Sequence, residues 1–201
     1  MEDQARLSAL SYQSTRELLA ERFHVSEQLL RDLNPDAAFD EAGSSIIVPV
    51  PGPPLAASVE RIEVDKSTSE IRAYDSSDTI VASYPVTIGS AEFPSPSGSM
   101  EVVSVTRNPK YHFDPKGRNW GPTRAVTLAP GPNSPVGTTW IALSEETYGI
   151  HGSPDPQLIA KTSSHGCVRL TNWDAEELRE AVSKGTRVDF VGLEEQADAG
   201  E

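Results

Sequence analysis

Short segments of alternating apolar and polar residues, separated by proline and glycine, run from residue 61 to residue 192. Successive side chains of a strand point to opposite faces, so this alternation is typical of strands with one buried face. Strands this short and closely spaced predict a mainly β domain, a β-sandwich or barrel, rather than a parallel α/β sheet. We expect strands over 61–65, 69–75, 79–89, 99–109, 125–130, 138–144 and 186–192.

Three other segments have the pattern of helices. Residues 14–23 and 26–34 each carry an apolar stripe after a serine that can cap a helix, and together they predict a helical hairpin. One late helix is expected to begin at Thr171, with Asp174 in a near capping box, and to end at Lys184-Gly185.

These patterns divide the chain into parts. Residues 1–50 form a small α+β module, whose last element is a predicted strand over 44–51 that proline ends. A stiff, proline-rich linker follows over 51–58. The main domain occupies 59–192, and the acidic tail, 193–201, is expected to be disordered.

The net charge limits the partners of the chain. At −13 it is expected to be repelled by nucleic acid and by anionic lipid surfaces. The sequence has no run of about 18 apolar residues that could span a membrane. The first residues do not resemble a signal peptide, so we expect either a cytoplasmic protein or a mature form whose export signal precedes Met1.

The chain has one cysteine, Cys167, which excludes an internal disulfide. A single cysteine is often a small buried apolar residue, but two histidines, His151 and His165, accompany this one. A thiol becomes a good nucleophile when an imidazole helps it to ionise, and either ring could do so. No Cys/His/Asp cluster has the spacing of metal ligands, so we predict neither a metal nor a cofactor.

The residues around these groups resemble the signature of the L,D-transpeptidase (YkuD-type) family. His151-Gly152 and Ser164-His165-Gly166-Cys167-Val168-Arg169 match its two paired motifs. Further matches lie at 95–98, 133–137 and 148–150, so the resemblance covers about 58–191. A papain-like protease is disfavoured, because there the cysteine precedes its histidine.

The resemblance implies a mechanism and a substrate. Cys167 is implied to be the nucleophile and His151 its base, held by the carbonyl of Gly152. His165 and Gly166 are implied to line the substrate and oxyanion wall. Arg169 is expected either to pair with a stem carboxylate or only to support the loop, and Ser164 to make local hydrogen bonds.

The implied substrate is the peptidoglycan stem peptide, which family members cross-link 3→3 with release of D-alanine through a thioester. Water in place of the amine acceptor implies L,D-carboxypeptidase activity, and a non-catalytic peptidoglycan-binding protein is the other alternative. The resemblance also implies acylation by carbapenems. Because this substrate lies in the periplasm or cell envelope, we favour an export signal upstream of Met1.

The first module resembles part of a LysM module, the β-α-α-β unit that binds glycan strands. The resemblance rests on the paired helices, on Leu33-Asn34-Pro35 and on residues 43–49. The opening strand of that unit and its glycine turn are absent, so the module is expected either to bind glycan or only to pack against the main domain.

A long polar segment with several aromatic residues, 107–132, interrupts the strands. A connection of this length without secondary structure is usually functional or disordered. We predict that this segment, 107–132, forms a lid over the thiol that contacts the stem peptide, which deletion of residues 111–122 tests.

Overall fold

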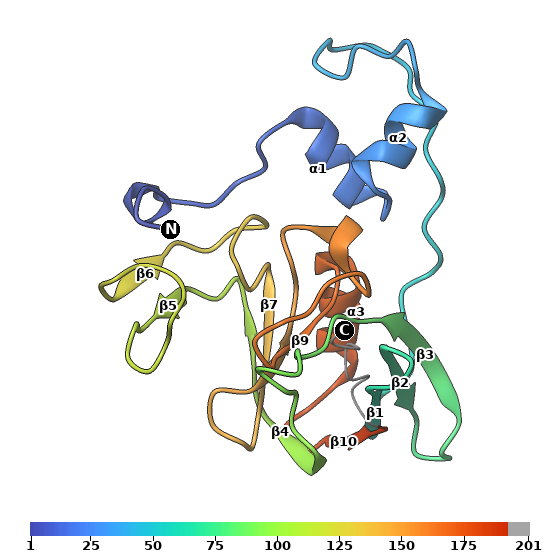
Figure 1. Cartoon of the computed structure of the whole chain (residues 1–201). Helices are drawn as coiled ribbons and strands as arrows, with labels where there is room; N and C mark the ends of the chain where they lie inside the picture. The colour runs from blue at the N-terminus through green and yellow to red at the C-terminus, as the bar shows by residue number, and fades with distance from the viewer. Residues whose placement is uncertain (193–201) are drawn as a thin grey trace, which may run out of the picture.

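The computed structural model describes residues 1–192, most of which form a curled β domain with few helices (Figure 1). The prediction of a mainly β fold is therefore confirmed. Eight strands form the main sheet in the order β3-β2-β1-β10-β4-β7-β8-β9. Their bounds are β1 (Arg61–Asp65), β2 (Glu70–Tyr74), β3 (Ile80–Pro85), β4 (Gly98–Arg107), β7 (Thr139–Leu143), β8 (Gly149–His151), β9 (Val168–Arg169) and β10 (Arg187–Val191).

The sheet is mixed, and its two edges approach each other. β1 pairs with β10 and β8 with β9 in parallel, whereas the other neighbours are antiparallel. The register of β4 against β7 shifts between Val102 and Ser104, an irregularity of the kind that bends a sheet. Beyond β3, Thr87 forms a bridge with Arg169 in β9, which joins the opposite edges. This contact gives the sheet its barrel-like form.

The main hydrophobic core lies between the sheet and the late helix, α3 (Asn172–Ala181). In β1 and β2 every second residue is buried, as the alternation predicted. Burial of these side chains is the main favourable contribution to folding, about 25 cal/mol per Å² of apolar surface. Ala175 and Leu178 of α3 belong to this core, as does Val182, which follows the helix.

The start of α3 agrees with the prediction, and its end does not. The Thr171 side chain accepts a hydrogen bond from the Asp174 N–H, so the predicted cap is confirmed. The predicted end at Lys184-Gly185 is wrong, because the helix already ends at Ala181 and Val182 is extended. Gly185 instead has a φ of 93° in the turn that leads into β10.

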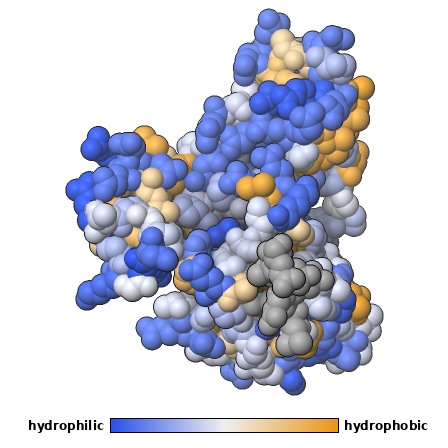
Figure 2. Space-filling model, in the orientation of Figure 1, coloured by the Kyte–Doolittle hydropathy of each residue, from blue (hydrophilic) through white to orange (hydrophobic). Residues whose placement is uncertain are grey.

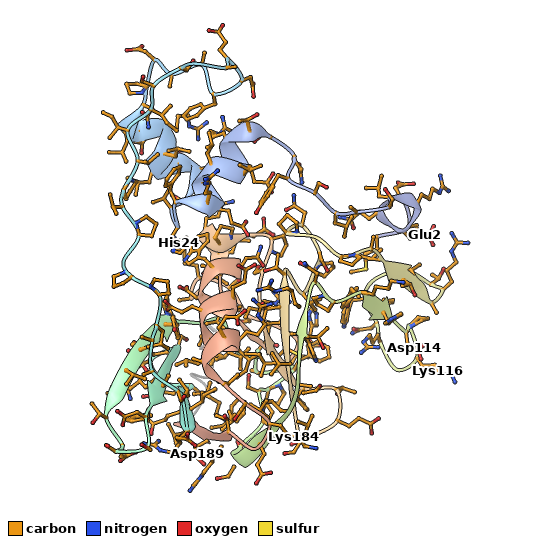
Figure 3. The ribbon with its side chains drawn as sticks, turned by 180° about the vertical axis from the view of Figure 1, so that it is seen from behind. Glu2, His24, Asp114, Lys116, Lys184 and Asp189 are labelled. Carbon is orange, nitrogen blue, oxygen red and sulfur yellow. The ribbon has the colours of Figure 1, made fainter. Side chains whose placement is uncertain are left out.

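The helical hairpin of the N-terminal module is present as α1 (Thr15–Arg22) and α2 (Glu27–Leu33). Ser14 and Ser26 cap the two helices through their side chains. A separate small core contains Ala20, Val25 and Leu30. The module sits on the N-terminal end of α3, where the His24 ring stacks on Trp173 with ring centroids 5.5 Å apart (Figure 3).

The predicted strand over 44–51 is absent, and the LysM-like unit therefore lacks both of its strands. Residues 44–50 have no regular secondary structure. The side chain of Asn34 holds this segment, accepting from the Ile47 N–H at 2.6 Å and donating to the Ile47 carbonyl at 2.7 Å, and Val48 packs on the small core. An extended segment needs a neighbouring strand to become part of a ladder, and none is available here.

The segment after α2 leaves apolar side chains in solvent. Ile47 is 65 % exposed and Val50 is 91 % exposed. Hydrophobic surface lies along the edge of the helical module where this segment descends (Figure 2). The linker at 51–58 continues without regular structure, but Leu55 packs on the main core and its N–H donates to Glu177. The tail predicted at 193–201 lies outside the described residues.

The long segment at 107–132 contains a hairpin: the strand predicted over 125–130 is present, whereas the expectation that the rest lacks secondary structure is wrong. β5 (Tyr111–Phe113) pairs antiparallel with β6 (Val126–Leu128) as a separate two-stranded sheet. Short 3₁₀ turns lie at η1 (Gln4–Arg6) and η2 (Pro156–Leu158). Within residues 1–192, no helix is long and apolar enough to cross a bilayer.

Candidate active site

Two short parallel strands place the predicted nucleophile and base on the same face of the sheet. In the pairing of β8 with β9, Ile150 lies opposite Val168 and His151 lies opposite Arg169. Paired residues project from the same face of a sheet, as do residues two positions apart on one strand. Cys167 immediately precedes β9, two positions before Arg169. The register therefore places the thiol diagonally across the strand pair from the imidazole.

His151 is buried and its ring is held from one side. Nδ1 lies 2.6 Å from the carbonyl oxygen of Gly152, the contact expected from the motif. Because a carbonyl oxygen can only accept, Nδ1 carries the proton and Nε2 is left as the basic nitrogen. Burial lowers the pKa of His151 to about 4, against the opposing effect of the Gly152 hydrogen bond. The ring is therefore neutral at pH 7.

The backbone that orients His151 is fixed by a buried asparagine. A Cβ on Gly152 would come within 2.3 Å of Asn172 Oδ1, so only glycine fits there. Asn172 Oδ1 accepts from the Thr138 N–H at 3.1 Å, and its Nδ2 donates to the Pro132 carbonyl. The sequence analysis missed Asn172. Its place directly after the cap residue of α3 was the available signal, but the contact itself depends on the fold.

Cys167 is partly exposed, and its surroundings act on the thiol in opposite directions. Burial raises its pKa, while the backbone of Gly149 and the charges of Arg169 and Arg118 lower it. Sγ lies 3.7 Å from the Thr147 carbonyl oxygen, at a residue with a φ of 74°. Since burial has the largest effect, the resting thiol is protonated. The ionisation that an imidazole can assist is therefore not complete in the resting protein.

The loop before the cysteine is held by serine hydroxyls. Ser164 Oγ donates to the Cys167 carbonyl at 2.5 Å and accepts from the Gly166 N–H at 3.0 Å. Ser95 Oγ donates to the Gly166 carbonyl at 2.9 Å and accepts from the Gly89 N–H. Ser164 thus makes the local bonds predicted for it. The part played by Ser95 was missed, although its motif was recognised.

Gly166 is a position that only glycine can occupy. Its φ is 111°, and an added Cβ would lie 2.8 Å from the ring of Tyr148. A backbone in this region is strained for any other residue. The backbone that leads into Cys167 is therefore held in one conformation, and the Gly166 N–H is used within the loop by Ser164 Oγ.

The β5–β6 hairpin reaches the site through aromatic contacts. Trp120 stacks on His165 with ring centroids 4.2 Å apart, and Phe93 contacts the same His165 ring with centroids 5.0 Å apart. Trp120 in turn packs edge-on against Phe113 at 5.0 Å. The His165 residue as a whole is exposed, but partial burial of its ring lowers its pKa. This ring therefore forms part of the wall beside Cys167, in contact with the hairpin.

Two arginines give the site a positive character within an acidic protein. Within residues 1–192, neither Arg169 nor Arg118 has a carboxylate within salt-bridge distance. Both charges lower the pKa of the Cys167 thiol, and both also lower the pKa of the Tyr111 hydroxyl. Arg118 lies beside the rings of Phe113 and Trp120. The sequence analysis missed Arg118, because a charged residue in a loop carries no pattern.

No group of three or more metal-binding side chains occurs in residues 1–192. The described site is thus made of one thiol, one neutral imidazole, fixed backbone N–H groups and two arginines. Such a set can carry out acyl transfer through a covalent intermediate.

Solved structures share this fold. An L,D-transpeptidase from Mycobacterium smegmatis superposes with a TM-score of 0.55 at 15 % identity, over 67 % of this chain and 59 % of that one. L,D-transpeptidase 3 from Mycobacterium tuberculosis, in complex with a faropenem-derived adduct, gives 0.52 at 19 % identity, over 65 % and 59 %. At these identities the likeness concerns the fold. The chain spans less than two thirds of either structure.

The chain is also similar in sequence to known proteins. The chain is 34 % identical to YkuD of Bacillus licheniformis over 179 residues, which are 88 % of this chain and 93 % of the relative. The sequence model of the YkuD family, described as the L,D-transpeptidase catalytic domain, matches residues 59–190. That range contains both strands of the site and the whole Ser164–Arg169 loop. The chain therefore belongs to the YkuD family of L,D-transpeptidase enzymes.

Proposed function

We propose that this enzyme forms 3→3 cross-links between peptidoglycan stem peptides through a thioester on Cys167. The observation that carries the proposal is the state of His151. Its Nδ1 is bonded to the Gly152 carbonyl, its low pKa keeps Nε2 unprotonated, and it shares a face with the only thiol. A neutral imidazole in this position is a general base.

The first half-reaction forms the acyl-enzyme. As Sγ of Cys167 attacks the carbonyl carbon of the third stem residue, its proton passes to Nε2 of His151. The S–C bond forms, the C–N bond to D-alanine breaks, and His151 returns the proton to the leaving amine. Because the resting pair is neutral, proton transfer accompanies attack and no ion pair has to be kept buried beforehand.

The second half-reaction releases the enzyme. An amine of a second stem attacks the thioester, His151 takes one of its protons, and the S–C bond breaks to regenerate the thiol. The Cys167 N–H is assigned to the oxyanion in both halves, because the Gly166 N–H is already donated to Ser164 Oγ. Water in place of the amine gives carboxypeptidase activity with the same residues.

The arginines supply the contact with the substrate. A stem peptide carries carboxylates, and a charge-assisted bond from an otherwise unpaired guanidinium contributes about 1.5–3 kcal/mol. Arg169 faces the thiol from β9, and Arg118 reaches it from the hairpin. We assign Arg169 to a donor carboxylate. Within residues 1–192 it forms no salt bridge, and Asp155 acts on it only from beyond salt-bridge distance, which supports this choice over a purely supporting role.

The hairpin is proposed to be the lid over the thiol. The stack of Trp120 on His165 supports this, since it brings the hairpin beside the nucleophile. Removal of residues 111–122 should abolish acylation in a protein that still folds. Unchanged acylation in that deletion contradicts the lid.

Incubation with a disaccharide tetrapeptide that ends in D-alanine tests the reaction. Mass spectrometry should show a cross-linked dimer and free D-alanine, and Cys167→Ala should form neither. Tripeptide without dimer supports the carboxypeptidase alternative. Absence of any product supports the non-catalytic alternative and contradicts the proposal.

The compartment follows from the substrate, and we propose that the enzyme works in the periplasm or cell envelope. Fractionation of cells that express the complete gene is the test. Glycan binding by residues 1–50 stays a prediction from resemblance. Retention on insoluble peptidoglycan by this chain, but not by residues 51–201, is the outcome that it requires.

A further inference from the structure

We propose that the first residues of the chain are a positioning strap for the active-site hairpin. The N-terminal strap, residues 1–13, precedes α1 and lies outside the range 59–190 that the family shares. In Figure 1, η1 lies beside β6, and Figure 3 shows Glu2 next to the hairpin that carries Asp114 and Lys116. This inference rests on the proposed function only where it concerns the effect of the strap on acylation of Cys167.

Leu10 completes the core of the hairpin. A two-stranded hairpin is marginally stable alone and needs a further apolar surface. Phe113, Val126 and Leu128 supply one side of a small core, and Leu10 supplies the other at 3 % exposure. Ala5, within η1, packs against the same cluster. Without the strap, these three hairpin side chains would border solvent.

Backbone bonds lock the strap beside the segment that follows β6. The Leu10 N–H donates to the Pro130 carbonyl at 2.9 Å, and the Leu10 carbonyl accepts from the Asn133 N–H at 3.0 Å. The Asn133 side chain donates to the Ser11 carbonyl at 2.9 Å. These bonds fix both the position and the direction of the strap.

Gly131 allows the backbone of the strap to come close to the segment that follows β6. Its φ is 150°, and an added Cβ would lie 2.1 Å from the carbonyl oxygen of Leu10. Only glycine allows two backbones to come this close. An exposed ion pair between Arg124 on the hairpin and Glu2 adds a further contact at 3.2 Å.

A continuous line of packed side chains joins the strap to the site. Leu10 supports Phe113, Phe113 supports Trp120, and Trp120 stacks on His165 two residues before the nucleophile. The hairpin also brings Arg118 to the thiol. Loss of Leu10 should therefore displace the hairpin wall while leaving the main sheet and its core intact.

The test compares Leu10→Ser with Leu10→Ala and the conservative Leu10→Met in the full chain. The first readout is trypsin cleavage after Lys116, Arg118 and Arg124, which are exposed on the hairpin. Leu10→Ser should speed cleavage there by roughly tenfold or more, with Leu10→Ala between it and the wild type. Leu10→Met should restore protection, since methionine fills irregular apolar space.

The second readout is the rate of Cys167 acylation by a carbapenem, followed by intact mass. Leu10→Ser should slow it by roughly ten- to hundredfold, because a displaced wall misplaces the reacting groups. Leu30→Ala, a matched change in the core of the helical module, should acylate at the wild-type rate. Circular dichroism monitors the fold in each variant.

Three outcomes overturn the strap: unchanged hairpin cleavage in Leu10→Ser, wild-type acylation by a variant with an opened hairpin, or equal slowing in Leu30→Ala. A wild type that does not acylate contradicts the proposed function instead. In that case the proteolysis still decides whether the strap holds the hairpin.

Discussion

Replacement of Glu21 by glutamine should change how the stability of this protein depends on pH. Glu21 lies on α1, and its carboxylate oxygen accepts from Asn172 Nδ2 at 2.6 Å, where the helical module meets α3. Burial and the neighbouring Glu176 and Glu17 raise its pKa from 4.5 to about 7. The module thus docks best when Glu21 is protonated.

The direction of the effect follows from proton linkage. Between pH 4.5 and about 7 the folded protein holds a proton on Glu21 that the unfolded chain has released. The free energy of unfolding therefore falls as pH rises through this window, and the contribution of the protonated group is complete only below it. Glutamine is neutral at every pH and keeps the oxygen that accepts from Asn172.

The magnitude is moderate because water reaches the group. A rise of this size corresponds to about 3 kcal/mol at about 1.36 kcal/mol per pKa unit. Glu21 lines an open cleft of about 400 Å³ between α1 and residues 154–157, together with Glu17 and Asp155. Screening by solvent in this cleft reduces the effect, and we expect about 1–2 kcal/mol.

Denaturant unfolding at pH 5, 6, 7 and 8 measures this difference. Glu21→Gln and the wild type should have similar stability near pH 5, and the variant should be more stable at pH 8. Glu41→Gln, an exposed change in the same module, should follow the wild type throughout. Parallel curves for Glu21→Gln and the wild type would refute the reasoning.

Further predictions concern the site. His151→Gln should slow carbapenem acylation by about 10²–10⁴-fold in stopped-flow assays. In the wild type the rate should be lost only as pH falls toward about 4, where His151 takes up a proton. Gly166→Ala should lower the free energy of unfolding by about 1–3 kcal/mol in denaturant titrations, because its φ is 111°; unchanged stability contradicts the strain. Arg169→Leu should raise KM about tenfold for a stem that ends in a carboxylate, and less for its amide; equal changes contradict a carboxylate contact.

Local patterns predicted those parts of the fold that depend on local forces. The alternation in residues 61–65 predicted β1, and Thr171 with Asp174 predicted the start of α3, because pleat and cap act over a few residues. The strand predicted at 44–51 failed for the opposite reason. A strand forms only against a partner, and an apolar alternating segment does not reveal whether a partner exists.

The candidate site was also predictable from the sequence only in part. Motif resemblance named Cys167 and His151, but β8 and β9 are too short to show a period, so their pairing could not be read from sequence. Asn172, Arg118 and Leu10 act on the site through contacts between distant segments. The neutral state of the proposed catalytic pair depends on burial, which only the folded chain defines.

The central claim is that Cys167 is an accessible nucleophile served by His151, and intact-mass measurement with a carbapenem tests it most directly. The wild type should gain the mass of one adduct, His151→Gln should gain it slowly, and Cys167→Ala should gain none. A folded wild type that remains unmodified, or an adduct that persists in Cys167→Ala, would contradict the account.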